Sequence, residues 1–252
     1  MRAIIIAAGK GTRLYPLTKN TPKSLIEISD GLTLLESQLY SLKENDIKDV
    51  TIIVGYRAEQ IEAKIKKYQS DFNINTVYNP FYDSSNNLIS VWMARHFMQD
   101  DFITINGDDI FNASVIENLL KSEHSITMVT DEKSEYDDDD MKIIHKNGQV
   151  LKVSKQISLA EANGESVGII KFSGYGPKIY VNTLEEMVRD EDNKNAFYLK
   201  AIQEIINKGY PVHFSKCEES DWGELDFHPD LVFIRDYMKK SNFVEKIFTP
   251  KK

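Results

Sequence analysis

The sequence has one cysteine, no long apolar run and no excess of basic residues. The single cysteine, Cys217, cannot form an intramolecular disulfide or a thiolate metal cluster, so we interpret it as buried and inert. The apolar run over residues 1–8 is too short to span a bilayer, and it lacks the longer apolar region of a secretory signal. We therefore expect a cytoplasmic protein with no membrane partner. The formal net charge of −8 argues against a nucleic-acid partner.

Histidine metal sites and internal repeats are also absent from the sequence. Its five histidines show no ligand spacing such as H-x-x-x-H, so we interpret them as structural or surface residues. The 252 residues, 41% of them hydrophobic and 28% charged, are typical of a folded protein. That length suits one large α/β domain or two small ones. No sequence pattern indicates an oligomeric state.

Apolar runs typical of strands alternate with helical patterns in the first half of the chain, at residues 3–7, 33–45, 50–54 and 58–68. Further strands are expected at residues 75–78, 102–105 and 125–129. This alternation predicts an α/β fold with a Rossmann-like, doubly wound, mostly parallel sheet. In such folds, ligands bind beyond the carboxyl ends of the strands.

The second half of the chain has a different pattern. Strands at residues 141–145 and 149–153 are joined through Asn147-Gly148, which predicts a hairpin and an antiparallel insertion. The remaining expected elements are helices near 184–188, 197–206 and 229–239 and a strand near 212–215. The acidic run at residues 137–140 is interpreted as a solvated loop. We expect one domain over residues 1–252, with a core over about 1–135, an inserted part over about 136–228, and a C-terminal helix and tail over 229–252.

The strongest chemical signal is the segment AAGKGTRL at residues 7–14, which is followed by TPKSL at residues 21–25. Gly9 and Gly11 allow the backbone N–H groups to approach phosphates, and Arg13 and Lys23 add positive charge. The pattern predicts a triphosphate cradle. It differs from the dinucleotide motif, which lacks the paired cations, and from the Walker loop, in which lysine directly follows the last glycine. The alternative is a glycine turn beside surface cations.

A candidate metal ligand follows the expected strand at residues 102–105. Asp108 comes directly after this strand, where an α/β fold places its ligands. Magnesium prefers oxygen ligands and commonly takes one or two carboxylates beside substrate phosphates. The alternative for Asp108 is an N-cap of a helix over residues 112–121, although Asp109 is expected to be the cap of that helix.

With these motifs, the chain resembles the sugar-phosphate nucleotidyltransferase superfamily, in which the first strand leads into a G-x-G-[ST]-R loop followed by a P-K motif. Later segments resemble the branch that acts on phosphocholine, 2-aminoethylphosphonate and related phosphorylated molecules. These segments are YNPFY at 78–82, NNLIS at 86–90, Lys155, GESVG at 164–168 and WGELD at 222–226. The resemblance implies an Mg²⁺-dependent enzyme that transfers CMP from CTP to a small phosphorylated acceptor and releases pyrophosphate.

The resemblance also implies roles for individual residues. Catalysis is assigned to Lys23 and Arg13. Nucleotide binding is assigned to Ala7, Ala8, Gly9, Gly11, Thr12, Gly55, Asn86 and Asn87. Lys155 is expected to contact the acceptor phosphate, Glu165 to face a cationic group of the acceptor, and Trp222 to offer a cation-π surface. Asp108 and Asp226 are expected to hold the metal. Residues 1–135 then form the nucleotide-binding core and residues 136–228 the acceptor-binding part.

Several assignments have plainer alternatives. Asn86 and Asn87 also suit a turn or a helix start. Trp222 also suits a packing role, and Asp226 a helix cap before Pro229. The rival functions are a sugar-1-phosphate nucleotidyltransferase that uses UTP or dTTP, a glycosyltransferase, and a noncatalytic nucleotide sensor. The Lys23 cradle favours a triphosphate over the nucleotide sugar of a glycosyltransferase.

Overall fold

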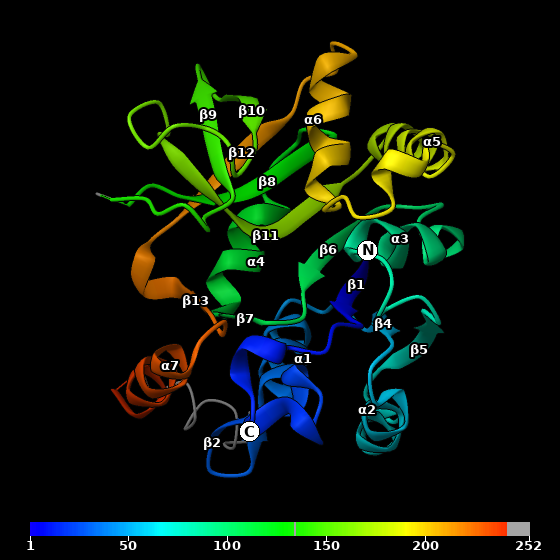
Figure 1. The fold of residues 1–252 in the computed structure, drawn as a ribbon, viewed down its shortest axis with the longest axis vertical. Coiled ribbons are helices and arrows are strands. Elements are labelled where there is room, and N and C mark those ends of the chain that lie inside the picture. Colours follow the sequence, from blue (N-terminus) through cyan, green and yellow to red (C-terminus); the bar gives the residue numbers. More distant parts are fainter. Residues whose placement is uncertain (134, 241–252) are drawn as a thin grey trace.

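The computed structural model describes residues 1–133 and 135–240, and it is built around one nine-stranded sheet (Figure 1). In spatial order, the strands are β5 (Asn73–Tyr78), β4 (Asp49–Val54), β1 (Arg2–Ala7), β6 (Phe102–Asn106), β11 (Gly164–Phe172), β8 (Ile126–Asp131), β12 (His213–Cys217), β10 (Gln149–Val153) and β9 (Lys142–Lys146). The predicted C-terminal tail beyond residue 240 lies outside the described residues.

The sheet is mixed, with a parallel half that matches the predicted α/β fold. Strands β5, β4, β1 and β6 are parallel, and β8 and β12 are parallel to each other. Strand β11 runs antiparallel between β6 and β8. The sequence reasoning did not predict β11 as a strand, although all nine of its residues are buried. A strand buried on both faces lacks the apolar and polar alternation that reveals a half-exposed strand.

Helices cover both faces of the sheet, as a doubly wound fold requires. One apolar cluster packs α3 (Asn87–Met93), α5 (Gly176–Met187) and α6 (Leu199–Asn207) against the sheet. A second cluster packs α1 (Leu34–Glu44), α2 (Ala58–Ile65) and α4 (Ala113–Leu120) against the opposite face. The helix expected near residues 184–188 is the last part of α5, which begins much earlier because Pro177 fits its first turn.

The predicted hairpin is confirmed. Strands β9 and β10 pair antiparallel, and their turn places Asn147 and Gly148 at φ values of 53° and 78°. Strand β9 also pairs with β11, and β10 pairs with β12. The hairpin therefore extends the main sheet, and the proposed boundary near residue 135 stays a prediction. Among the described residues, none of the helices combines the length and apolar character needed to cross a membrane.

Four short strands and the last helix bring the end of the described chain back to its beginning. Strand β7 (Asp109–Phe111) pairs with β13 (Trp222–Glu224), and β2 (Glu27–Ser29) pairs with β3 (Leu32–Thr33). Helix α7 (His228–Lys240) shares a third apolar cluster with the β2–β3 hairpin and with Leu14. Burial of this cluster holds the late WGELD segment beside the glycine loop, as Figure 1 shows for β13, β7 and α7.

Candidate active site

The glycine loop leaves the carboxyl end of β1 and packs tightly against Lys23. Gly11 has φ 61°, and a Cβ at this position would lie 3.1 Å from Lys23 Cβ and 3.2 Å from Thr18 Cγ2. The Thr18 hydroxyl donates a hydrogen bond to the Gly11 carbonyl at 2.6 Å. Any side chain at position 11 would therefore strain the backbone and separate the loop from Lys23.

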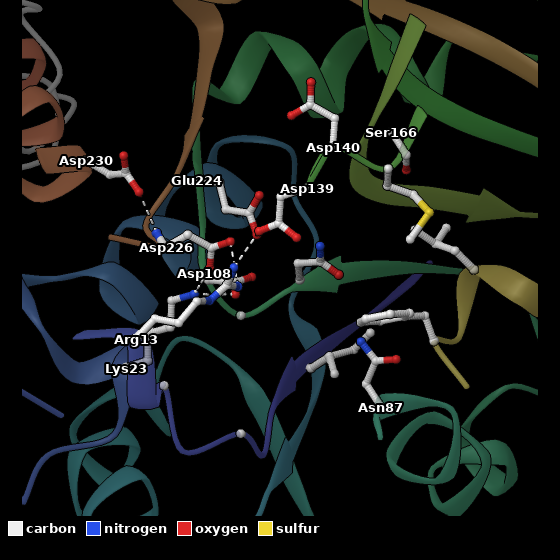
Figure 2. A pocket seen from close by; sticks show the side chains of 18 of the residues that line it. Arg13, Lys23, Asn87, Asp108, Asp139, Asp140, Ser166, Glu224, Asp226 and Asp230 are labelled. Carbon is white, nitrogen blue, oxygen red and sulfur yellow. Dashed lines mark hydrogen bonds and ion pairs between the residues drawn. The ribbon is translucent and has the colours of Figure 1, made fainter. Parts of the chain in front are cut away.

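Lys23 lies between two carboxylates that come from distant parts of the chain. Its Nζ is 2.6 Å from Asp108 Oδ2 and 2.6 Å from Asp226 Oδ1. Burial alone would lower the pKa of Lys23, but the charges of both carboxylates outweigh it, and the pKa is raised. Arg13 joins the same group, with NH2 2.6 Å from Asp226 Oδ2. In Figure 2, Arg13 and Lys23 point toward Asp108 and Asp226. The structure thus brings the two predicted cations and the two predicted metal ligands together.

A compact group of carboxylate oxygens lies beside Lys23. Oxygen atoms of Asp108, Asp109 and Glu224 all lie within 4.8 Å of one another. Asp109 is fully buried, and neither of its carboxylate oxygens has a hydrogen-bond partner among the described residues. Burial raises the pKa of both Asp109 and Glu224 well above the ordinary values, and the neighbouring carboxylates add to the shift. Such a set of oxygen donors fits a hard divalent cation such as Mg²⁺.

Two details of this acidic group differ from the sequence reasoning. The expectation that Asp109 caps a helix is wrong, because Asp109 belongs to β7 and α4 begins only after Asn112, its N-cap residue. Glu224 was missed, although it stands two residues before Asp226 in a strand-like segment. The period of two in a strand places such residues on one face, and the register pairs Glu224 with Asp109.

The acidic run at residues 137–140 reaches into the site. Asp139 Oδ2 lies 2.6 Å from Arg13 NH1, and Asp139 Oδ1 lies 2.6 Å from Lys155 Nζ. The hydrogen bond from Lys155 lowers the pKa of Asp139. The interpretation of this run as a solvated loop is confirmed for Asp137, Asp138 and Asp139, which are exposed, although Asp139 also contacts two cations. It is wrong for Asp140, which is 8% exposed. Contacts between charged residues that are far apart in the chain cannot be predicted from the sequence alone.

Glu165 contacts a lysine that the sequence reasoning missed. Lys133 Nζ lies 2.7 Å from Glu165 Oε2 and 2.8 Å from Asp140 Oδ2. Burial raises the pKa of Glu165 to about 7, while Lys133 opposes this shift. Trp222, the other residue expected at the acceptor, donates a hydrogen bond from Nε1 to Asp131 Oδ2 at 2.9 Å. Its ring packs against the second apolar cluster, so the packing role is confirmed.

Asn86 and Asn87 begin helix α3, which confirms the alternative of a helix start. The Asn86 side chain caps the helix by accepting a hydrogen bond from Asn87 N at 2.7 Å. Asn87 Oδ1 accepts a hydrogen bond from Tyr198 N at 2.8 Å. Because its carbonyl oxygen is engaged, the side-chain NH₂ is the group that Asn87 can offer to a ligand.

Most of the charged residues and both asparagines described above line one cavity of about 750 Å³. All the predicted site residues line it except Gly55. A Cβ on Gly55 would lie 2.7 Å from the Ala8 carbonyl oxygen, so Gly55 packs behind the glycine loop and supports it. Figure 2 shows Asn87 across the cavity from Arg13 and Lys23, with Asp140 and Ser166 on a third side. The cavity therefore offers one end where the two cations lie among carboxylates, an amide end and a mixed-charge wall.

Comparison with known proteins agrees with this geometry. The family model described as nucleotidyl transferase matches residues 2–137. A choline-phosphate cytidylyltransferase of Haemophilus influenzae is 33% identical over 90% of this chain and 92% of its own length. A CTP:phosphoglutamine cytidylyltransferase of Campylobacter jejuni is 26% identical over 92% of this chain and 98% of its own length. The solved structure of a CTP:phosphocholine cytidylyltransferase from Streptococcus pneumoniae shares the fold, with a TM-score of 0.77 and 23% identity over 93% of this chain and 97% of that one. The chain belongs to the nucleotidyl transferase family and is a nucleotidyltransferase.

Proposed function

We propose that this nucleotidyltransferase transfers CMP from CTP to a small phosphorylated or phosphonate acceptor that carries nitrogen, with release of pyrophosphate. The observation that carries the proposal is the meeting of Arg13 and Lys23 with Asp108 and Asp226 at one end of the cavity. Two relatives with cytidylyltransferase names, for choline phosphate and phosphoglutamine, support CTP and a nitrogen-bearing acceptor.

The reaction is an in-line displacement at the α-phosphorus of the nucleotide. An acceptor phosphate oxygen forms the new bond to phosphorus, and the bond to the β-phosphate oxygen breaks with its electron pair leaving on pyrophosphate. No strong general base is needed, because a phosphate monoester has a second pKa of about 6 and is mostly ionised near neutral pH. The chain has to align the two anions and offset their charge.

Arg13 and Lys23 provide this charge for the departing pyrophosphate. In the structure their charges are balanced by Asp108, Asp139 and Asp226. A triphosphate that enters the cradle competes with these carboxylates for the same N–H donors. Asp108 and Asp226, with Glu224 beside them, would hold Mg²⁺, which when bound neutralises charge on the α-phosphate and on the acceptor oxygen.

Asn87 supports a preference for cytosine. With its oxygen engaged by Tyr198 N, its side-chain NH₂ acts only as a donor toward the base. Cytosine presents an unprotonated N3 that accepts a hydrogen bond, whereas uracil and thymine present an N–H at that position. A donor facing N3 therefore selects CTP over UTP and dTTP. We assign the backbone of Ala7 and Ala8, which line the same cavity, to the same base.

Lys155 is our candidate for the acceptor phosphate. Its ammonium group lies on the cavity wall and is paired with Asp139 rather than with a fixed structural partner. The exposed Asp139 can release Lys155 when an acceptor phosphate arrives. The acceptor would then lie between the nucleotide cradle and the wall formed by Lys133 and Glu165.

The test is a pyrophosphate-release matrix of nucleoside triphosphates against phosphorylated acceptors. The acceptors are phosphocholine, 2-aminoethylphosphonate, other phosphorylated amines and amino acids, and sugar 1-phosphates. The proposal expects activity with CTP and a nitrogen-bearing acceptor. Activity only with UTP or dTTP and a sugar 1-phosphate would support the sugar-1-phosphate rival, and nucleotide binding without any turnover would support a sensor.

A further inference from the structure

Three charged side chains form a mixed-charge group on the cavity wall. Lys133 Nζ lies 2.8 Å from Asp140 Oδ2 and 2.7 Å from Glu165 Oε2. Lys133 follows β8, Asp140 precedes β9 and Glu165 belongs to β11, so two neighbouring loop residues meet a strand residue that is more distant in sequence. We call this group the Lys133 triad. All three residues line the cavity, and both carboxyl groups are at least nine-tenths buried.

The Lys133 triad differs from an ordinary surface ion pair because its carboxyl groups are buried. Burying two carboxyl groups and an ammonium costs several kcal/mol per ion, and apolar residues would fill the same space at less cost. The triad is also not saturated. Asp140 Oδ2 accepts a hydrogen bond from Asp137 N, whereas Glu165 Oε2, although 2.7 Å from Lys133 Nζ, accepts no hydrogen bond from the described residues. Lone pairs of Glu165 and an N–H group of Lys133, which has three donors for its two ion pairs, are therefore available to a ligand in the cavity.

The charges of the triad are poorly suited to an acceptor that carries only a cation. The positive charge that faces Glu165 is already supplied by Lys133. Two nearby aromatic rings are also already close to lysines, because Lys155 lies 5.2 Å from the centre of the Phe197 ring and Lys133 lies 5.9 Å from that of Tyr136. A quaternary ammonium, which binds best against free aromatic faces, gains little from this arrangement.

We propose that the Lys133 triad is the subsite for the distal end of the acceptor and selects a zwitterionic group, an ammonium beside a carboxylate. The proposal rests on the proposed function, and it narrows the acceptor to a phosphorylated amino acid. The ligand ammonium donates to Glu165 and Asp140, while the ligand carboxylate accepts the remaining hydrogen of Lys133. A zwitterion adds no net charge to the buried group, so each buried ion gains a partner and none is left uncompensated.

The substrate ranking tests the proposal. The wild-type enzyme is assayed with CTP and three acceptors of similar length, O-phosphoserine, phosphoethanolamine and phosphocholine, by pyrophosphate release. O-phosphoserine carries both distal charges, phosphoethanolamine lacks the carboxylate, and phosphocholine also replaces the N–H donors by methyl groups. We expect kcat/KM to be highest for O-phosphoserine by at least ~10-fold, in line with the loss of one charged hydrogen-bond partner.

Two variants separate charge recognition from structural support. Lys133→Met should lower kcat/KM for O-phosphoserine by at least ~30-fold, and for phosphoethanolamine much less, with KM for CTP unchanged. Lys133→Arg keeps the charge and should retain most of the preference. The matched control is Lys216→Met, since Lys216 pairs with Glu132 beside the triad but does not line the cavity. If Lys133→Met does not fold, the wild-type ranking of acceptors and the Lys133→Arg variant still test the proposal.

The outcomes distinguish the two proposals. A wild-type enzyme that prefers phosphocholine or phosphoethanolamine, or a Lys133→Met variant that loses activity equally with all three acceptors, overturns the zwitterion subsite and leaves cytidylyl transfer intact. Absence of CTP-dependent pyrophosphate release with every phosphorylated acceptor instead overturns the proposed function itself.

Discussion

Replacing Lys23 with methionine removes the cation that lies 2.6 Å from both Asp108 and Asp226. Methionine keeps the length of the side chain, so the main loss is the charge. Removing one partner of a buried ion pair costs about 3–5 kcal/mol. Because Arg13 still pairs with Asp226 and Asp108 is partly exposed, we expect a smaller loss, about 2–3 kcal/mol in free energy of unfolding. For a protein of this size, that lowers Tm by roughly 4–12 °C.

The catalytic effect of the same variant should be larger than its effect on stability. Lys23 no longer offsets charge on the leaving pyrophosphate, a contribution typically worth several kcal/mol, so kcat should fall at least ~100-fold. Mg²⁺ should restore part of the lost Tm, because the carboxylates left without Lys23 can share the ion, but it should not restore kcat.

The assays are thermal unfolding with and without Mg²⁺ and pyrophosphate release at saturating CTP. Lys43→Met is the matched control, since Lys43 pairs with Asp71 on the surface away from the active-site cavity. Turnover of the folded Lys23→Met variant within ~3-fold of wild type would refute the assignment of Lys23 to the reacting phosphates.

Other predictions follow from single contacts. Asp108→Asn should abolish Mg²⁺-dependent activity because an amide is a poor ligand for this ion, and an unchanged metal titration would contradict that role. Asn87→Ala should reduce the preference for CTP over UTP at least ~10-fold, measured as the ratio of kcat/KM values. Asp139→Asn should lower KM for CTP, because Arg13 is freed from a competing carboxylate, and a raised KM would argue against that competition. Glu165 has a pKa raised to about 7, so the folded state binds more protons than the unfolded state between pH 4.5 and 7. Its contribution to stability therefore decreases as pH rises through that range, and Glu165→Gln should remove that decrease in a urea-unfolding series.

Sequence reasoning located the phosphate cradle because its parts are local. Gly9, Gly11 and Arg13 lie in one loop after one strand, and the structure brings Lys23 to that loop as expected. The position of Asp108 in the site could also be predicted, because the carboxyl end of a predicted strand is where α/β folds hold ligands. The parallel half of the sheet followed from the alternation of strands and helices.

The parts of the site that sequence reasoning missed depend on contacts between segments far apart in the chain. Lys133 and Glu165 are separated by a loop and a hairpin, and nothing near either residue indicates the other. Asp139 is exposed, as expected, but its contact with Arg13 could not be predicted from the sequence. Strand β11 was missed because complete burial removes the pattern by which strands are recognised.

The position of a phosphate label shows whether the enzyme transfers a cytidylyl group to a phosphorylated acceptor. The enzyme is incubated with Mg²⁺, the best acceptor from the matrix and CTP labelled with ³²P at either the α or the γ position. With cytidylyl transfer, the α-label appears in the acceptor product and the γ-label in pyrophosphate. Appearance of γ-label in the acceptor product, or of α-label in CMP alone, would contradict cytidylyl transfer.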